Sequence, residues 1–153
     1  MSERFFDVSA YAYAHRGLWR GRTPENSIAA FEAARAAGVG VELDVRLTAD
    51  GVPVVFHDAG LERMCGHREL LARVASDELA GHQLPDGSPI PTLAQALAIM
   101  GDLPVLIELK VDGAGGEIAD RVASAIEGLA GLYGVMSFDE PTVARLCRLV
   151  TDR

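Results

Sequence analysis

The segment at residues 39–58 constrains the fold of this chain more than any other part of the sequence. Its first half places an aliphatic residue at every second position and charged residues between them, so the two kinds of side chain would lie on opposite faces of a β-strand. Glu42 and Asp44 would then be neighbours on the polar face, where two carboxylates repel each other unless a cation lies between them or both face water. After a turn at residues 48–51, a second apolar strand ends in His57. A carboxylate pair and an imidazole at strand ends can build a metal-assisted acid–base site, whereas the alternation alone also fits a strand with one solvated face.

Length and charge limit the class of partner. The chain has 153 residues, a formal net charge of −8 and an isoelectric point near 4.9. This length is enough for one domain with a sizeable core, and the negative charge argues against a nucleic-acid backbone or an anionic membrane as the main partner. An anionic small molecule stays compatible with it, because a bound divalent cation reverses the local charge.

The cytoplasm is the expected location of the chain. Residues 1–13 contain neither the basic start nor the continuous apolar run of a signal peptide. No apolar stretch approaches the roughly 20 residues that a membrane-spanning helix needs, so we expect no stable membrane insertion. The two cysteines, Cys65 and Cys147, give no disulfide framework, which fits a reducing compartment.

Strands and helices alternate along the rest of the chain. We expect strands at residues 11–14, 39–47, 52–56, 103–111 and 133–138, and helices at residues 28–37, 93–100, 117–129 and 140–150. Asn26 or Ser27 is expected to cap the first of these helices, and Thr92 the second. Such alternation makes a parallel sheet, and the polar strand face favours a barrel over a doubly wound sheet, whose two faces are both covered by helices and apolar. A full (β/α)₈ barrel needs roughly 250 residues, so the chain supplies about five of the eight strands.

Five short motifs fall at the predicted strand ends. They are His15-Arg16-Gly17, Pro24-Glu25-Asn26-Ser27, Glu42-Leu43-Asp44, His57-Asp58 and Glu108-Leu109-Lys110. Together, in this order and spacing, they resemble the glycerophosphodiester phosphodiesterase family, and the resemblance runs from about residue 13 to residue 138. It implies a TIM (β/α)₈-type barrel that hydrolyses glycerophosphodiesters, with the help of a divalent metal, to an alcohol and glycerol 3-phosphate.

The resemblance also implies a role for each motif. Three carboxylates are implied as the metal ligands: Glu42, Asp44 and Glu108. Three oxygen donors suit a hard cation, Mg²⁺ or Ca²⁺. Glu25 is implied at the same site, either as a further ligand or as a group that orients a histidine.

The remaining implied roles concern protons and phosphate. His15 and His57 are implied as the general acid–base pair, without an indication of which is the acid and which the base. Arg16 and Lys110 are implied to neutralise the phosphate oxygens, a task that suits both side chains. By contrast, His67 and His82 lie in a segment without a motif, and we expect them to be structural.

The later strands of such a barrel are absent from this sequence. We therefore expect residues 1–153 to form a glycerophosphodiester phosphodiesterase-like domain that is truncated on its C-terminal side, either as a fragment of a longer protein or as one of two copies that pair. Self-association through the open barrel edge is the expected consequence. Two alternatives stay open: a catalytically incompetent, metal-binding remnant of the family, and a related barrel phosphodiesterase of the phospholipase D type.

Overall fold

A five-stranded sheet forms the centre of the computed structural model, which describes residues 6–112 and 115–151. The strands are β1 (Tyr13–His15), β2 (Gly40–Leu47), β3 (Pro53–Val55), β4 (Val105–Leu109) and β5 (Tyr133–Met136). The α-helices are α1 (Ile28–Ala36), α2 (Glu62–Cys65), α3 (Leu93–Met100), α4 (Gly116–Ile126) and α5 (Glu140–Thr151). Three 3₁₀-helices complete the described elements: η1 (Val8–Ala10), η2 (Leu71–Arg73) and η3 (Glu78–Gly81). The predicted order of strands and helices is confirmed.

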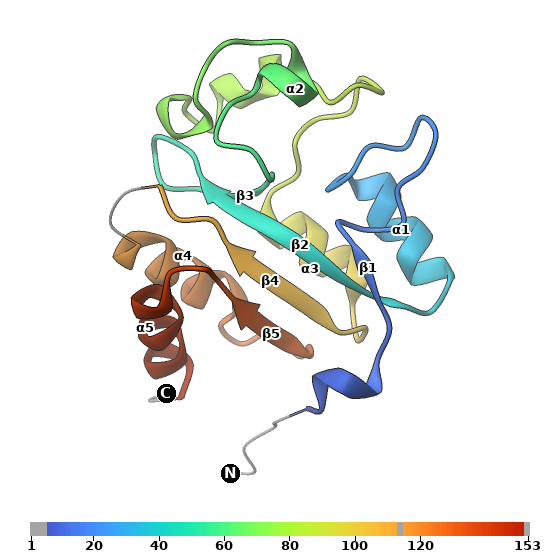
Figure 1. Ribbon diagram of the computed structural model, residues 1–153, viewed down its shortest axis with the longest axis vertical. Coiled ribbons are helices and arrows are strands. Elements are labelled where there is room, and N and C mark those ends of the chain that lie inside the picture. The colour runs from blue at the N-terminus through green and yellow to red at the C-terminus, as the bar shows by residue number, and fades with distance from the viewer. Residues whose placement is uncertain (1–5, 113–114, 152–153) are drawn as a thin grey trace.

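Four of the strands run parallel in the order β1-β2-β4-β5, as expected for part of a barrel built from strand–helix units. The fifth strand, β3, lies off this path and pairs antiparallel with β2. The short turn at residues 48–51 is the reason, because so few residues can reverse the chain but cannot cross over to a parallel position. Figure 1 shows α3 and α4 behind the sheet, with α1 and α5 at its two sides, so that the face toward the viewer carries no helix.

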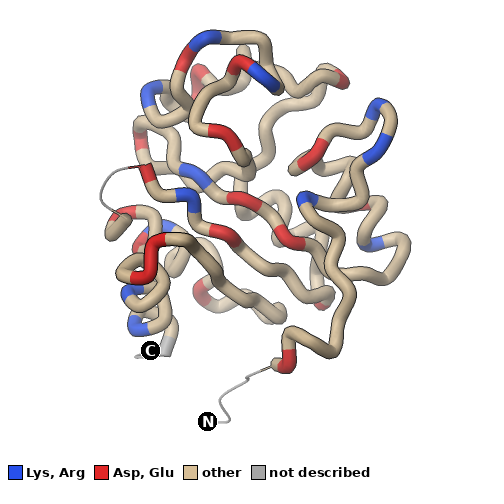
Figure 2. The backbone as a smooth tube through the Cα atoms, in the orientation of Figure 1, with Lys and Arg blue, Asp and Glu red and all other residues tan. Residues whose placement is uncertain are grey.

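The two faces of the sheet have opposite character, as the alternation in residues 39–47 predicts. Val41, Leu43 and Val45 of β2 are fully buried, and they pack in one core with residues of α1, α3, α4 and α5. On the other face, Glu42 lies beside Leu106 of β4, and Asp44 lies beside Glu108. Figure 2 shows the acidic and basic positions that β2 and β4 carry across the middle of the sheet. The helix layer therefore holds the strands, and the helix-free face is available for polar groups.

Two side chains fix the starts of the helices that flank the site. Ser27 caps α1 by accepting a hydrogen bond from the backbone N–H of Ala30. Thr92 caps α3 in a capping box with Gln95, in which each side chain accepts a hydrogen bond from the other residue's backbone N–H. Of the two residues predicted to cap α1, Ser27 is the one that does so.

The segment between β3 and α3 forms a small lobe with a core of its own. Its short elements, α2, η2 and η3, lie above the end of the sheet in Figure 1. The core of this lobe joins residues of the segment to two residues of the β3 region, and its buried members are Val54, Phe56, Leu61, Leu71, Val74, Leu79, Leu84 and Ile90. We refer to residues 57–92 as the lobe below.

Among the described residues, no helix is both long enough and apolar enough to cross a membrane.

The outer edge of β5 generates the first testable prediction. Among the described residues β5 pairs only with β4, and Met136 and Phe138 at its end are 41% and 96% exposed. Because an unpaired edge with apolar side chains favours association, residues 1–153 should elute as dimers or larger species in size-exclusion chromatography with light scattering. Met136→Lys should shift the population toward monomer, because a charge on an edge strand opposes pairing.

A matched control for this prediction is Leu129→Lys, which changes an apolar residue outside the sheet whose exposure (47%) is similar to that of Met136 (41%). It should leave the association state unchanged. A wild-type chain that is monomeric at all concentrations would contradict the prediction.

Candidate active site

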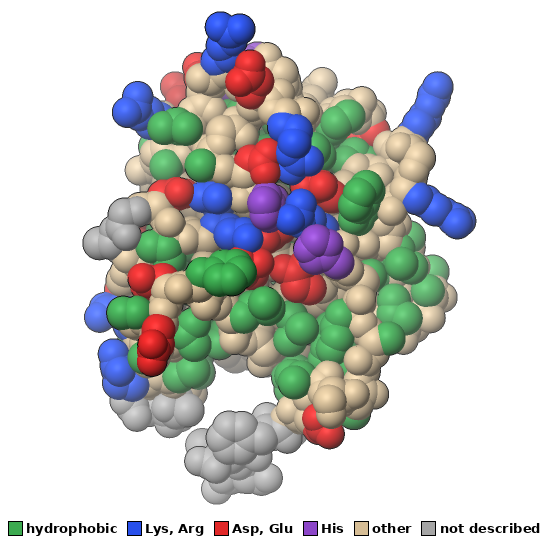
Figure 3. Space-filling model, viewed as in Figure 1, with side chains coloured by type: hydrophobic (Ala, Val, Ile, Leu, Met, Phe, Trp, Pro, Cys, Tyr) green, Lys and Arg blue, Asp and Glu red, His purple; other side chains and the backbone are tan. Residues whose placement is uncertain are grey.

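The predicted site residues come together at the carboxyl ends of the parallel strands. His15 is the last residue of β1, Glu42 and Asp44 lie within β2, and Glu108 lies at the end of β4 with Lys110 just beyond it. In Figure 3, histidine, acidic and basic side chains gather in the middle of the helix-free face. This is the end of a parallel barrel sheet where active sites are built.

Three carboxylates on two neighbouring strands form the centre of the site. Glu42, Asp44 and Glu108 are 8%, 0% and 7% exposed. One carboxylate oxygen from each lies within 4.8 Å of the others. Asp44 and Glu108 are direct cross-strand neighbours, which places their side chains side by side. We call these three residues the acidic cluster.

Burial and mutual repulsion make the acidic cluster costly without a cation. Burial and, after it, the neighbouring charge of Asp44 raise the pKa of Glu42 to about 7. Within the described residues, Glu42 Oε1 and Asp44 Oδ1 are buried and accept no hydrogen bond, although Lys110 Nζ lies 3.1 Å from the latter oxygen. Buried carboxylate oxygens without hydrogen bonds cost free energy unless a cation satisfies them. The oxygen-only donor set fits a hard divalent cation.

Lys110 is the cation nearest to the acidic cluster. Its Nζ donates a hydrogen bond to Glu108 Oε1 at 2.6 Å. Its side chain also lies at the edge of a hollow of about 430 Å³ that is lined in part by Arg46, Ser137 and Phe138. Lys110 Nζ lies 6.0 Å from the centre of the Phe138 ring. A lysine between a carboxylate cluster and an open hollow can turn from one to the other.

Arg16 is held in place by the loop that follows β1. Its backbone has a positive φ of 59°, and its N–H donates to the Glu42 carbonyl oxygen at 2.8 Å. The next residue must be glycine, because a Cβ on Gly17, which has φ +84°, would lie 2.7 Å from the Ala30 Cβ of α1. The Arg16 guanidinium lies 3.0 Å from Glu25 Oε1 and 3.2 Å from Asp44 Oδ2.

Glu25 lies differently from what the sequence implies. It contacts two arginines rather than a histidine: Nη1 of Arg16 at 3.0 Å and Nη2 of Arg63 at 2.6 Å. Burial works against its charge, but the hydrogen bond and charge of Arg63, with those of Arg16, outweigh this and lower its pKa. It does not belong to the acidic cluster. Glu25 therefore stands as the holder of two arginines, which is a third role beside the two that were predicted.

The two predicted acid–base histidines have different surroundings. His15 is largely exposed, and its Nε2 lies 3.8 Å from Glu42 Oε2. His57 is one-third exposed, and its Nδ1 lies 2.7 Å from Asp58 Oδ1. Hydrogen bonds from Arg63 and from His57 hold the pKa of Asp58 at about 2. Because Asp58 is ionised, the proton of a neutral His57 ring belongs on Nδ1, which leaves Nε2 to exchange protons.

Three residues of the site were not predicted from the sequence. Asn26 was expected only as a possible helix cap, but its Nδ2 donates to Asp44 Oδ2 at 2.9 Å. Arg46 donates through Nε to the His57 carbonyl oxygen at 2.8 Å, and its place on the polar face of β2 was the available signal. Arg63 of α2 contacts both Asp58 and Glu25. No pattern around Arg63 indicates this, because the contact depends on how the lobe folds back over the sheet.

The family model described as the glycerophosphoryl diester phosphodiesterase family matches residues 15–125. The chain belongs to this family. It is 35% identical over 145 residues to the probable glycerophosphodiester phosphodiesterase 2 of Mycobacterium tuberculosis. The aligned region covers 93% of this chain and 53% of that relative. The glycerophosphodiester phosphodiesterase of Caldanaerobacter subterraneus is 36% identical over 106 residues, covering 64% of this chain and 43% of the relative.

Solved structures of family members confirm the barrel assignment. A glycerophosphodiester phosphodiesterase from Parabacteroides distasonis matches with a TM-score of 0.79 and 30% identity, covering 91% of this chain and 60% of that one. An Oleispira antarctica phosphodiesterase, solved in complex with the product sn-glycerol-3-phosphate, matches with a TM-score of 0.80 and 27% identity, covering 95% and 64%. The fold is that of a TIM barrel, of which the described sheet is a part, and the chain spans about half the length of the curated relatives it matches.

A metal titration tests the acidic cluster. Asp44→Asn removes one negative charge at its centre and should weaken Mg²⁺ or Ca²⁺ binding at least tenfold in isothermal titration calorimetry, because hard cations depend on ligand charge. Glu62→Gln, which changes an exposed carboxylate of α2, should leave the binding constant unchanged. Equal affinity in the wild type and in Asp44→Asn would contradict a metal site here.

The Asp58 ion pairs predict a pH-dependent stability. Because the pKa of Asp58 falls from 3.8 to about 2 on folding, its charged form stabilises the native state above about pH 4, and this contribution is lost as pH falls toward 2. Asp58→Asn should therefore lower the free energy of unfolding by roughly 1–2 kcal/mol at pH 7. Urea unfolding at pH 7, 4 and 3 should show the difference narrowing as the pH falls. Glu32→Gln, an exposed change on α1, should have no such profile.

Proposed function

We propose that this chain takes part in the metal-dependent hydrolysis of glycerophosphodiesters to an alcohol and glycerol 3-phosphate. The observation that supports this best is the acidic cluster, in which two buried carboxylate oxygens accept no hydrogen bond and Glu42 lies beside His15. Cleavage of a phosphodiester gathers negative charge on the phosphoryl oxygens and needs one proton removed and one donated. The site offers groups for both tasks.

The proposed metal ligands are Glu42, Asp44 and Glu108, and the proposed ion is Mg²⁺ or Ca²⁺. When bound, such an ion would neutralise charge on the phosphate oxygens and help to orient the substrate. Asn26 supports this arrangement, because its amide holds one oxygen of Asp44 and leaves the other, which lies 3.1 Å from Lys110 Nζ, to face a cation. Asn26 has a positive φ of 54° just before the α1 cap, a conformation that asparagine adopts more readily than most residues.

Arg16 and Lys110 are the proposed phosphate-binding cations. Lys110 now contacts Glu108 and Asp44, which are also the proposed ligands. A divalent cation there would repel the ammonium group, and the hollow beside Ser137 and Phe138 is the open direction for it. Arg16 is fixed by Glu25 and Asp44 and has less freedom to move. We therefore propose that Arg16 is a fixed charge near the phosphate and that Lys110 is a movable one.

His15 and His57 are the proposed acid–base pair. The family resemblance implies that the glycerol hydroxyl of the substrate attacks phosphorus and expels the alcohol, and that water then opens the cyclic phosphate. One histidine takes the proton of the attacking hydroxyl, and the other donates a proton to the leaving alcohol. Asp58 prepares His57 for either role, because it orients the ring and keeps a proton on Nδ1. Glycerol 3-phosphate as the product is supported by the ligand of the Oleispira antarctica structure.

An activity assay tests the proposal. Purified chain should release glycerol 3-phosphate from glycerophosphocholine when Mg²⁺ or Ca²⁺ is added, measured with a coupled dehydrogenase assay. His15→Ala and His57→Ala should each lower turnover by roughly 10²–10⁴-fold, because each removes one proton-transfer group. Arg68→Gln, an exposed change in the lobe, should keep wild-type turnover. Unchanged turnover in either histidine variant would contradict its assignment.

The activity assay and the metal titration together separate the two alternative functions. Metal binding by calorimetry without any turnover would identify a metal-binding remnant. Turnover of lysophospholipids in preference to glycerophosphocholine would instead identify a phosphodiesterase of the phospholipase D type.

A further inference from the structure

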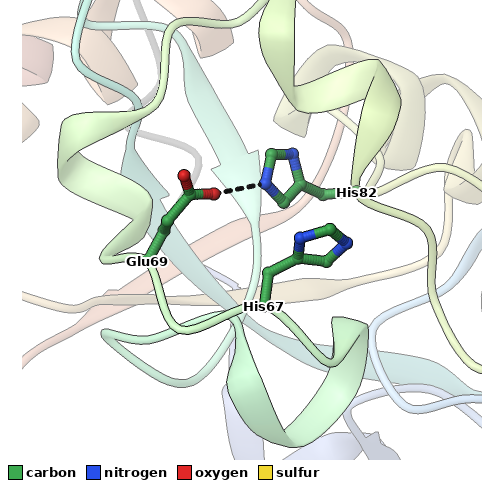
Figure 4. A group of neighbouring side chains, drawn as sticks. All are labelled: His67, Glu69 and His82. Atoms are coloured by element: carbon green, nitrogen blue, oxygen red, sulfur yellow. Dashed lines mark hydrogen bonds and ion pairs between the residues drawn. The ribbon is translucent and has the colours of Figure 1, made fainter.

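A second group of potential ligands lies in the lobe, away from the acidic cluster. Among the described residues two groups of side chains are arranged so that they could hold a metal ion, and the second consists of His67, Glu69 and His82. One ligand atom from each lies within 4.8 Å of the others. Figure 4 shows the Glu69 carboxylate and the two imidazole rings gathered together, with His67 and Glu69 on one segment and His82 on another.

The backbone of two members, Glu69 and His82, is anchored to the lobe core. The carbonyl oxygen of Glu69 accepts a hydrogen bond from the N–H of Leu61 at 2.9 Å. The N–H of His82 donates to the Leu79 carbonyl oxygen at 2.9 Å, directly after η3. Leu61 and Leu79 are both buried in the lobe core. Two of the three side chains therefore start from fixed positions, which lowers the entropy lost when a ligand binds.

The two ring nitrogens of His82 both face oxygen acceptors. Nε2 lies 2.7 Å from Glu69 Oε2, and Nδ1 lies 3.4 Å from the Glu78 carbonyl oxygen, while the side chain is only 12% exposed. A neutral ring carries one N–H, so one of its lone pairs must face an oxygen. At 2.7 Å the Nε2 atom shares a proton with the Glu69 carboxylate, and a divalent cation that replaces this proton would be bound by the Nε2 lone pair while Nδ1–H donates to the Glu78 carbonyl oxygen. A histidine that donates its second nitrogen's proton to a backbone carbonyl is the usual arrangement of a metal-binding histidine.

His67 adds the second imidazole. Its ring centre lies 4.5 Å from that of His82, with the planes tilted by 59°. The ligand atoms of a tetrahedral zinc site lie about 3.4 Å apart, as follows from bond lengths near 2.1 Å. His82 Nε2 and Glu69 Oε2, which lie 2.7 Å apart, would have to separate slightly to admit the ion, and the exposed side chains of His67 and Glu69 can rotate to reach the required spacing.

We propose that His67, Glu69 and His82 bind a divalent transition metal of the zinc class, with water completing the coordination shell. Two imidazole nitrogens and one carboxylate oxygen suit Zn²⁺, whereas Mg²⁺ and Ca²⁺ prefer oxygen ligands throughout. The ion would join the segment after α2 to the segment after η3 and so fasten the lobe. It is separate from the acidic cluster, and the proposal does not depend on catalytic activity.

Cobalt(II) is a suitable probe, because its visible absorption reports nitrogen coordination and zinc(II) displaces it. Untagged chain, freed of metal by a chelator and held in excess Mg²⁺, should develop visible bands that saturate at one equivalent of cobalt(II) chloride. His67→Asn and His82→Gln should each weaken this binding by roughly 100-fold, at the upper end of what the loss of an outer-shell partner causes. Glu69→Gln should weaken it as well.

Two controls locate the site. Asp44→Asn, in the acidic cluster, and Glu62→Gln, an exposed carboxylate near the lobe site, should both keep the wild-type cobalt titration. His67 is exposed, so His67→Asn should keep the wild-type circular dichroism spectrum and melting curve, which removes misfolding as an explanation. Absence of stoichiometric bands in the wild type, or bands that persist in His67→Asn and vanish in Asp44→Asn, would overturn the proposal.

Discussion

The crowding of three carboxylates on neighbouring strands is the constraint on which the rest of the site depends. Glu42, Asp44 and Glu108 are buried beside one another, and burial of like charges costs more than any single hydrogen bond returns. The surrounding groups all act against this cost. Lys110 and Arg16 bring positive charge to within about 3 Å, and the raised pKa of Glu42 lets one charge be lost by protonation.

Apolar packing against the helix layer offsets the free-energy cost of the buried carboxylates. The same strands that carry the carboxylates bury Val41, Leu43 and Ile107 against the helices on their other face. Each such side chain contributes about 1.5–3 kcal/mol when fully buried. Period-two alternation thus couples the two faces: the apolar face fixes the register, and the register fixes which carboxylates become neighbours.

Arg63 connects the lobe to the site. It reaches from α2 to Glu25 and Asp58, and Asp58 in turn holds His57. The orientation of His57 therefore depends on the fold of the lobe, which carries none of the proposed metal ligands of the acidic cluster. The proposed metal site fastens the same segment at residues 67–82. A stable lobe would hold Arg63 in place, so the two sites share one structural element although their ligand chemistry differs.

The sequence by itself determined the strand–helix order, the polar and apolar faces of β2 and β4, and the family resemblance, because periodicity and short motifs are local properties of the chain. Tertiary structure decided the rest. Whether Asn26 would cap a helix or bind Asp44, and whether Glu25 would meet a histidine or two arginines, depended on how β1, α1 and the lobe approach one another. The gathering of His67, Glu69 and His82 likewise needed the lobe core to bring two segments together. Such contacts join residues 9 to 38 positions apart in the chain, and no local pattern specifies them, since their partners become neighbours only once the apolar core has packed.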